Sequence, residues 1–351
     1  AVTNLTKAYV RFGTDIAVIS RNKHPRIEHT NRRNLRIIRF PLKSAYYSKK
    51  TKQFKPAAIH RWLAKQRMTK PDGIHIHSIQ FKDLAKYYQA MYRTPVIYTC
   101  HSLIHSEPGP KRIKKRALIN QIQLLKIANI IVVPSRSERK KLIKLYPFCA
   151  KKAAVIHHGI AHRRAVRRRS SPRRLLFVGR LVPSKGVVPL LKAIAIIKRG
   201  GKKVRLDLVG KGSKIYMQQL NKWIKRLGIS SEVRLLGFRK HSQVQKMYPS
   251  YGAVVMPSRQ ESFGLVALEA LASGVPLVST RAGGLKDFVN GNVAQTISKA
   301  EANAIARAIR SMWSHRKLTN RRVRAGRILA AQFRWPNAAG KYKRLFKAIR
   351  R

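Results

Sequence analysis

Two glutamates, Glu261 and Glu269, are separated by seven residues in a stretch where carboxylates could bind hydroxyl groups. An ionised carboxylate has two acceptor oxygens and can accept hydrogen bonds from two neighbouring hydroxyls. Acidic residues are scarce in this chain, because Asp and Glu together number 12 in 351 residues. Both glutamates could be ordinary residues of a helical region, but their occurrence in one short window favours a functional role.

The residues around the two glutamates predict a strand, a loop, a helix and a second strand. An apolar strand is expected over 252–257, and apolar residues after Ser262 recur at spacings of three and four, which indicates a helix. Gly274 is expected to end this helix in the left-handed conformation. A second apolar strand is expected over 275–280 and leads to Gly283-Gly284.

The start of this helix suits an anionic ligand such as a diphosphate. A helix N-terminus at Ser262–Leu265 would present unpaired backbone N–H groups and a partial positive charge. Gly264 would let a ligand approach the backbone closely. A diphosphate could therefore be bound there by the backbone alone, with Glu261 at its edge and Glu269 two turns into the helix.

Two cations follow another apolar strand, expected over 174–179, at its carboxyl end. The segment that begins at Gly179 carries Arg180 and Lys185, and open α/β sheets bind ligands at this end of their strands. A forked guanidinium and a compact ammonium group together suit a diphosphate. Since Lys and Arg number 77, the spacing and the glycines support this prediction more than the charges do.

Histidines mark two predicted strands in the first half of the chain. His75 and His77 fall on one face of the strand expected over 73–80, and His101 follows the strand expected over 95–100. The first two histidines could bind a metal, but no acidic or thiol partner is near them in the sequence. A role in lining a ligand site or the core is therefore favoured.

Length and composition limit the class of protein. A chain of 351 residues implies about two domains. No run of 18 or more apolar residues predicts a membrane span, and the first residues lack a signal-peptide pattern. The two cysteines, Cys100 and Cys149, predict neither a disulfide framework nor a metal cluster, which fits a reducing cytoplasm.

The net charge of +65 is extreme and is spread along the chain. Such a charge would attract nucleic acid, anionic lipid or an acidic polymer, and says nothing of the fold. We favour a globally basic surface over a single dedicated groove.

Taken together, these residues resemble the Glu-x7-Glu signature of family 4 glycosyltransferases, which are retaining enzymes with the GT-B fold of two facing Rossmann-like domains. The resemblance covers residues 5–351 and is densest over 174–290. It implies an α/β protein with parallel sheets and a C-terminal helix that crosses back to the first domain. The donor would be a nucleotide-diphosphate-sugar. The acceptor would be a hydroxyl group of a glycan, a cell-envelope polymer or a lipid-linked molecule.

The resemblance also implies roles for particular residues. Arg180 and Lys185 would neutralise the diphosphate, Glu261 would contact the sugar hydroxyls, Glu269 would hold the ribose, and His101 would lie near the donor sugar in the interdomain cleft. Catalytic roles are implied for His101, Glu261, Arg180 and Lys185, donor binding for Gly179, Gly210, Phe238, Arg239, Ser262, Phe263, Gly264, Leu265 and Glu269, and acceptor-side positions for His75 and His77. No metal or other cofactor is expected, because no Asp-x-Asp motif is present.

We expect an N-terminal acceptor-side domain at 1–160, a linker at 161–172, a nucleotide-sugar domain at 173–334 and a returning helix at 335–351. The strand and glycine-rich loop with which family members open are not visible, and we expect the chain to begin after them. Where the family usually has Asn-Gly, this chain has His158-Gly159.

One alternative is a catalytically weak or inactive GT-B scaffold that binds a polyanion, such as nucleic acid, an anionic polymer or a membrane. The charge and the missing opening loop support it, whereas Arg180, Lys185, Glu261 and Glu269 favour an enzyme. We therefore predict a cytoplasmic glycosyltransferase of cell-envelope or polysaccharide biosynthesis. A basic enzyme could also contact the anionic inner face of a membrane. The sequence does not specify an oligomeric state.

Overall fold

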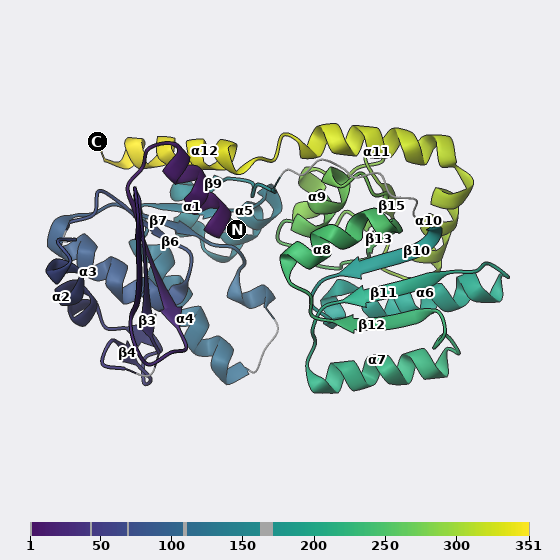
Figure 1. Ribbon diagram of the computed structural model, residues 1–351, viewed down its shortest axis with the longest axis horizontal. Coiled ribbons are helices and arrows are strands. Elements are labelled where there is room, and N and C mark those ends of the chain that lie inside the picture. The colour runs from purple at the N-terminus through teal and green to yellow at the C-terminus, as the bar shows by residue number, and fades with distance from the viewer. Residues whose placement is uncertain (1, 43, 69, 108–110, 162–170, 351) are drawn as a thin grey trace. The chain divides into compact units, whose positions relative to one another are not determined.

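The computed structural model describes residues 2–42, 44–68, 70–107, 111–161 and 171–350, and the chain divides into two compact units (Figure 1). Unit 1 comprises Ala1–Gly159 and Trp335–Arg351, and unit 2 comprises Ile160–Arg334. Each unit is α/β, as the apolar strands and amphipathic helices of the sequence predict.

Unit 2 is built on a parallel sheet of six strands in the order β12-β11-β10-β13-β14-β15. Consecutive strands are joined through helices or turns, so both faces of the sheet are covered. The strands are β10 (Ser171–Val178), β11 (Arg205–Val209), β12 (Val233–Gly237), β13 (Tyr251–Met256), β14 (Leu277–Thr280) and β15 (Gln295–Ile297). The helices are α6 (Val187–Arg199), α7 (Lys214–Arg226), α8 (His241–Met247), α9 (Leu265–Ala272), α10 (Ala302–Ser314) and α11 (Arg316–Ala330).

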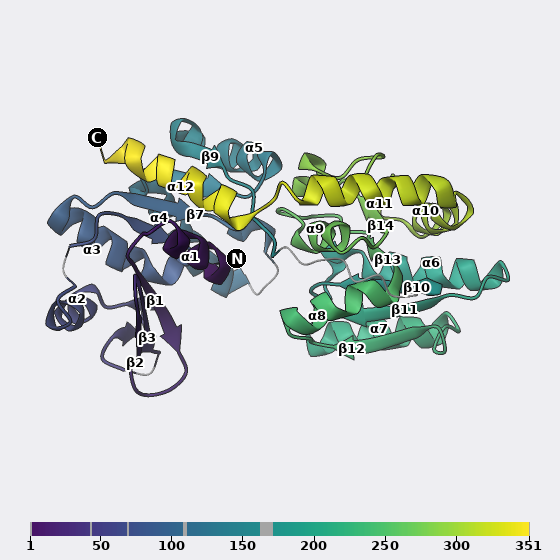
Figure 2. The same cartoon turned by 45° about the horizontal axis from the view of Figure 1, so that its top comes forward.

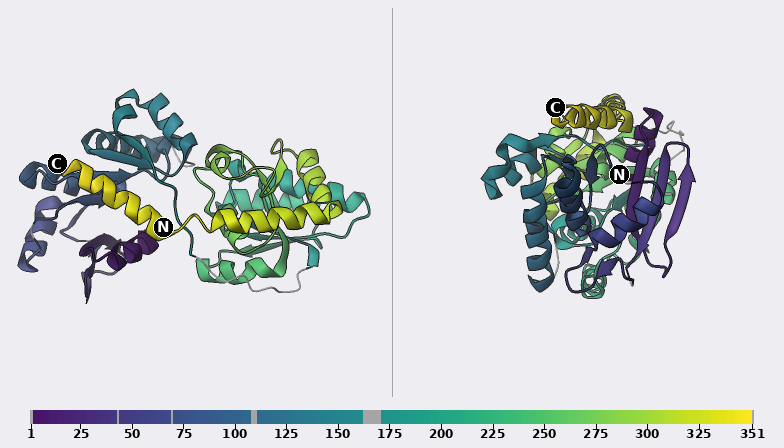
Figure 3. Two further views of the ribbon diagram at one scale, coloured as in Figure 1. Left: turned by 90° about the horizontal axis from the view of Figure 1, so that it is seen from above. Right: turned by 90° about the vertical axis from the view of Figure 1, so that its left-hand side faces the viewer.

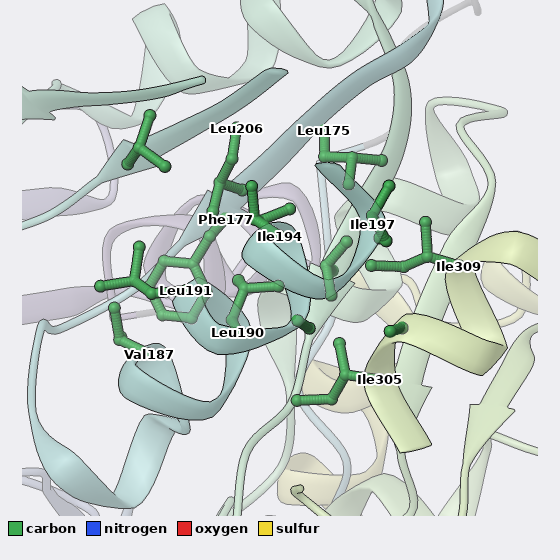
Figure 4. Close-up of a cluster of buried hydrophobic side chains, with 14 of the residues drawn as sticks. Leu175, Phe177, Val187, Leu190, Leu191, Ile194, Ile197, Leu206, Ile305 and Ile309 are labelled. Carbon is green, nitrogen blue, oxygen red and sulfur yellow. The ribbon is translucent and has the colours of Figure 1, made fainter. Parts of the chain in front are cut away.

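Two hydrophobic cores lie on the two faces of this sheet. Alternate residues of β10 show the division, because Leu175 and Phe177 belong to one core and Leu176 to the other. The first core joins the sheet to α6, α7 and α10, and Figure 4 shows Leu190, Ile194 and other side chains of α6 packed within it. The second core joins the sheet to α9 and α11. Burial on both faces explains why these strands read as continuous apolar runs.

A buried carboxylate, Asp207 of β11, links three strands of this sheet. Its side chain is 1% exposed and accepts hydrogen bonds from Arg174 of β10, Arg234 of β12 and the Tyr251 hydroxyl of β13. Burial alone would raise the pKa of Asp207, but the hydrogen bonds from Arg234, Tyr251 and Arg174 outweigh burial and hold this pKa below its usual range.

Replacing Asp207 with Asn is expected to lower the free energy of unfolding of unit 2 by about 3 kcal/mol, because two guanidinium groups lose their shared countercharge. Urea unfolding followed by circular dichroism measures this loss. Glu232→Gln is a matched control, since it removes an ion pair to Lys198, whose side chain is 42% exposed. Surface pairs of this kind contribute less than about 1 kcal/mol. Equal losses for the two variants would contradict a special role for Asp207.

Unit 1 contains a parallel four-stranded sheet in the order β6-β7-β8-β9, a three-stranded sheet in the order β1-β3-β2 and a small hairpin of β4 and β5. The strands are β1 (Ile16–Asn22), β2 (Glu28–Arg32), β3 (Leu35–Pro41), β4 (Tyr47–Ser48), β5 (Gln53–Phe54), β6 (Ile74–Ile76), β7 (Val96–Thr99), β8 (Ile130–Val133) and β9 (Ala153–Val155). The helices are α1 (Val2–Arg11), α2 (Pro56–Lys65), α3 (Lys82–Tyr92), α4 (Lys111–Ile127), α5 (Arg136–Leu145) and α12 (Trp335–Ile349).

The last helix, α12, packs on the first one, α1, although they stand at opposite ends of the chain. Leu5 and Tyr9 of α1 share a core with Trp335 and Tyr342 of α12. Figure 2 and the left view of Figure 3 show the two helices next to each other. The C-terminal helix therefore returns to the first unit, as predicted.

The structure differs from the sequence predictions in several short elements. The segment 44–56 combines lysines with aromatic residues and contains the β4–β5 hairpin, which was not predicted, and its Phe54 is buried in a core. Strands β2 and β15 were not predicted, because β2 is polar and largely exposed and β15 has only three residues. Within the described part of the chain, no helix is long and apolar enough to cross a bilayer.

The predicted linker lies mostly at 162–170, outside the described residues, and Ser171 and Pro172 already belong to β10. Ile160, placed by the sequence prediction in the first domain, lies in unit 2. Its backbone N–H donates to the carbonyl oxygen of Phe333, and Ile160 pairs with Arg334.

Candidate functional site

The loops that follow β10, β11, β12 and β13 meet at the carboxyl edge of the sheet of unit 2. Backbone hydrogen bonds join them: the N–H of Gly210 donates to the oxygen of Gly237 at 2.9 Å, and the N–H of Arg259 donates to the oxygen of Ser184 at 2.8 Å. This edge is where open α/β sheets bind ligands. The sheet thus gathers here the loops that carry the predicted donor-binding residues.

Lys185 and Glu261 form an ion pair within these loops. Lys185 lies in a 3₁₀ turn after β10, and Glu261 follows β13. The Lys185 Nζ and the Glu261 Oε2 are 2.6 Å apart, and the two side chains are 15% and 17% exposed. The pair places a cation that could bind a phosphate next to a carboxylate that could bind a hydroxyl.

The backbone of Gly283 and Gly284 presses against the backbone of Glu261. The N–H of Gly284 donates to the oxygen of Glu261 at 2.7 Å. Gly283 has a φ of 54°, and a Cβ atom at this position would lie 2.1 Å from the same oxygen. Only glycine fits so close an approach in this conformation. The Gly-Gly loop therefore fixes the position of Glu261.

Replacing Gly283 with Ala is expected to weaken nucleotide-sugar binding by roughly tenfold or more, because the loop must withdraw from Glu261 and displace its carboxylate. Calorimetric titration with the donor measures the effect. Gly291→Ala is the control, because Gly291 has no positive φ and an added Cβ there meets nothing within 4 Å. Donor binding that is the same in both variants would show that this contact does not position Glu261.

Glu269, the fifth residue of α9, is held by two side chains. Its Oε1 lies 2.7 Å from the Nε2 of His241, and its Oε2 accepts a hydrogen bond of 2.9 Å from the Tyr248 hydroxyl. The side chain of Glu269 is 11% exposed. Burial, together with Glu269, raises the pKa of Tyr248 well above its usual value, so this hydroxyl remains a donor. These contacts fix the orientation of the carboxylate.

The other predicted donor residues line the same edge. Arg180 is exposed directly after Gly179, and Gly210 follows β11. Phe238 follows β12 with 59% of its surface exposed, and the Nζ of Lys211 lies 5.3 Å from the centroid of its ring. An exposed aromatic ring next to cations offers a face for stacking a nucleobase. Arg239 donates a hydrogen bond from Nη1 to the Phe238 oxygen at 3.2 Å.

The helix after Glu261 begins later than the sequence prediction placed it. Helix α9 begins at Leu265, and Gly264 precedes it with a φ of 104°, so Ser262 and Phe263 lie outside the helix. Glu269 is thus little more than one turn into α9. The side chain of Phe263 is 3% exposed and packs on Phe288 and Phe333. Only the backbone of Phe263 can serve a ligand.

Unit 1 brings four histidines into contact, and we call His75, His77, His101 and His158 the histidine row. The Nδ1 of His77 lies 3.1 Å from the Nε2 of His101, whose Nδ1 lies 3.4 Å from the Nε2 of His158. The rings of His75 and His77 have centroids 4.0 Å apart, and the Nε2 of His75 lies 2.7 Å from the Thr99 hydroxyl. Among the described residues, no group of three or more His, Cys, Asp or Glu side chains is arranged to hold a metal ion.

Burial keeps the histidine row uncharged at neutral pH. Burial, and to a smaller extent the neighbouring imidazoles, lowers the pKa of His75 and of His158 to about 3. Burial likewise lowers the pKa of His101 to about 4 and that of His77 well below its usual value. His101 can therefore act as a neutral hydrogen-bonding group rather than as a cation.

Sequence reasoning missed three of these contacts. It noted His158 only as a replacement for a usual asparagine, and it gave His241 and Tyr248 no role. Nothing in their spacing links His158 to His101, or His241 and Tyr248 to Glu269. These pairs are created by the packing of separate segments.

Two family models match the chain and together cover residues 1–328. "Glycosyltransferase Family 4" matches residues 1–164, and "Glycosyl transferases group 1" matches residues 160–328. The glycogen synthase of Mycobacterium tuberculosis is 28% identical over 298 residues, which cover 82% of this chain and 72% of that protein. The D-inositol 3-phosphate glycosyltransferase of Streptomyces avermitilis is 29% identical over 271 residues, which cover 70% of this chain and 58% of that protein.

Solved structures share the fold. A sucrose-phosphate synthase of Thermosynechococcus elongatus superposes with a TM-score of 0.80 at 21% identity, over 99% of this chain and 92% of that one. HepE of Anabaena, in complex with UDP and glucose, gives a TM-score of 0.71 at 18% identity, over 90% of this chain and 87% of that one. The fold is that of the GT-B glycosyltransferases.

This chain belongs to the GT-B glycosyltransferases of the family 4 type. It is an enzyme that transfers a glycosyl group from a nucleotide-sugar donor. The alternative of an inactive polyanion-binding scaffold is not favoured by these relatives.

Proposed function

We propose that unit 2 holds the donor at the carboxyl edge of its sheet and that the transfer retains the anomeric configuration. In this proposal Arg180 and Lys185 neutralise the diphosphate, Glu261 binds the sugar hydroxyls and Glu269 binds the ribose. The observation that supports it best is the Lys185–Glu261 pair of 2.6 Å, which is held by two loops at this edge. Phosphate charge grows as the glycosidic bond breaks, so a fixed cation there stabilises the leaving group.

We further propose that unit 1 serves the acceptor, through His75, His77 and His101. A neutral imidazole can bind an acceptor hydroxyl without adding charge. Both ring nitrogens of His75 and of His101 already have partners, so the hydroxyl would replace one of these contacts or bind the Nε2 of His77. The acceptor would be a hydroxyl group of a glycan, a cell-envelope polymer or a lipid-linked molecule. No metal takes part in this proposal, and we expect EDTA to leave the transfer rate unchanged.

Calorimetric titration with UDP, GDP and ADP and with their glucose conjugates tests the donor site. UDP, UDP-glucose and ADP are titrated first, because solved structures of this fold contain them as bound ligands. Because any polyanion binds a chain of charge +65, only base-selective binding counts. We expect one nucleotide to bind selectively and Glu269→Gln to weaken it, whereas Glu232→Gln does not. If all nucleotides bind alike and Glu269→Gln changes nothing, the proposed donor site is wrong. Proton NMR of the product then tests retention.

We also propose a location in the cytoplasm, which the two cysteines fit, and the charge supports peripheral contact with an anionic membrane face. Flotation with vesicles should require anionic lipid and fall steeply as salt is added. Binding to neutral vesicles at high salt would disprove this contact.

A further inference from the structure

Unit 2 contains a groove at the opposite edge of its sheet from the candidate donor site. This groove has a volume of about 770 Å³ and lies at the amino ends of β10, β13 and β14, where Pro172, Gly252 and Pro276 form part of its lining. Helix α11 forms its long wall, and Figure 1 shows β10 starting near the turn between α10 and α11. A full strand of β13, roughly 20 Å, separates it from the carboxyl edge.

Among the described residues, the charged side chains that line the groove are all arginines. They are Arg173, Arg316, Arg324 and Arg327. No Asp or Glu occurs among the described lining residues. The carboxylate of Asp207, behind Tyr251, already accepts hydrogen bonds from two other arginines and from the Tyr251 hydroxyl. It is therefore not free to neutralise the groove.

The arrangement of these arginines goes beyond the high charge of the chain. Arg316, Arg324 and Arg327 are exposed, and within the described residues their guanidinium groups make no hydrogen bond or ion pair. With Asn320 and Val323 they follow one side of α11 for about 16 Å, at the helical rise of 1.5 Å per residue. The guanidinium groups therefore point into one groove but are distributed along it.

The facing wall is fixed and carries an aromatic ring. The Trp313 Nε1–H donates to the oxygen of Pro172 at 2.8 Å, and the guanidinium carbon of Arg173 lies 4.3 Å from the centroid of the Trp313 ring. Stacking on the Trp313 ring orients the guanidinium group of Arg173 and leaves its N–H groups available to bind a ligand. Fixed and forked donors suit phosphate groups better than mobile lysines would.

We propose that this groove binds a linear chain that carries several phosphate groups. A lone phosphate would contact only one end of a row about 16 Å long, whereas a chain can pair with successive arginines. A flat membrane surface would not enter a concave groove. Nucleic acid and a polymer of phosphodiesters or polyphosphate share the chemistry required. The sequence prediction favoured a globally basic surface over a single dedicated groove. This proposal adds one defined binding site to that basic surface.

Fluorescence anisotropy with end-labelled inorganic polyphosphate tests the proposal on the full-length chain. The groove variant R316Q/R324Q/R327Q is compared with R307Q/K317Q/R321Q, which removes the same charge from exposed residues that do not line the groove. Gln is a good helix former, so both variants should fold. At about 0.2 M salt the groove variant is expected to bind roughly tenfold more weakly or worse, and its salt slope should fall by about 2. The control variant should match the wild type.

Competitors identify the ligand. A single-stranded oligonucleotide that displaces polyphosphate from the wild type but not from the groove variant would identify nucleic acid as one source of the chain. Displacement by orthophosphate at equal phosphate concentration would overturn the need for a chain. The proposed site would be wrong if both triple variants bound polyphosphate equally weakly. It would also be wrong if the groove bound anionic vesicles but not polyphosphate.

A single substitution provides a second test. Asn320→Glu places a carboxylate in the groove, and Arg321→Glu places one just outside it. Only the first should strongly weaken polyphosphate binding. An equal effect of both would overturn the proposal. Donor titration should be unchanged in the groove variants, which separates this site from the donor site.

Discussion

Unit 1 is expected to unfold cooperatively between about pH 6 and pH 4.5, whereas unit 2 stays folded. The histidine row binds no protons in the folded state above about pH 4, because burial lowers the pKa of His101 to about 4 and the pKa values of His75 and His158 to about 3. In the unfolded chain these histidines bind protons near pH 6.5. The unfolded state therefore holds more protons between about pH 4 and 6.5, and stability must rise with pH in this window.

The size of the effect follows from the number of histidines. Each one that stays neutral on folding lowers stability by about 1.4 kcal/mol per pH unit below pH 6.5. Four together approach the whole stability of an ordinary domain, about 5–15 kcal/mol, near pH 5. Hydrogen exchange of peptides from each unit, measured by mass spectrometry as a function of pH, separates the two units. In the described part of unit 2, His241 and His315 are exposed, so this unit serves as an internal control.

Variants test whether the histidine row is the cause. His158→Asn should reduce the pH dependence of the stability of unit 1 by about one proton. His24→Asn should not, since the side chain of His24 is 77% exposed. If the units lose protection at the same pH, or if His158→Asn leaves the slope unchanged, the histidine row does not control acid stability.

Lys185→Met is expected to lower kcat/KM for glycosyl transfer by about 10²- to 10³-fold, because the departing diphosphate loses a fixed cation. Steady-state assays of transfer or of donor hydrolysis measure this loss. Lys198→Met is the matched control, since Lys198 also pairs with a glutamate, Glu232, but on the surface of unit 2. That variant should retain nearly full activity.

A double variant separates the loss of the cation from damage to the site. Lys185→Met alone leaves Glu261 as a largely buried carboxylate without its ion-pair partner. Lys185→Met/Glu261→Gln removes that charge as well. The double variant is compared with Glu261→Gln alone. If the ammonium group acts on the diphosphate, Lys185→Met slows the Glu261→Gln enzyme further. If Lys185 serves only to position Glu261, the double variant is no slower than Glu261→Gln.

The elements of unit 2 could be predicted from sequence because its strands are buried on both faces and its helices have regular apolar spacing. The helix expected after Ser262 is observed as α9, although it begins at Leu265, and Gly274 has the left-handed conformation expected at its end, with a φ of 70°. Strand β15 escaped prediction, because three residues carry too little pattern. The spacing of apolar residues predicts a helix or strand only where the segment is long enough for that spacing to recur.

The sequence by itself determined which residue types could bind a phosphate or a hydroxyl, and near which strand ends they occur. Only the tertiary structure decided which of them meet. Lys185 pairs with Glu261 across 76 positions, and Glu269 faces His241 of another helix. The histidine row gathers residues from three separate segments of the chain, and burial there lowers their pKa values. Spacing along a chain constrains neighbours within one helix or strand, whereas contacts between segments depend on how their apolar faces pack.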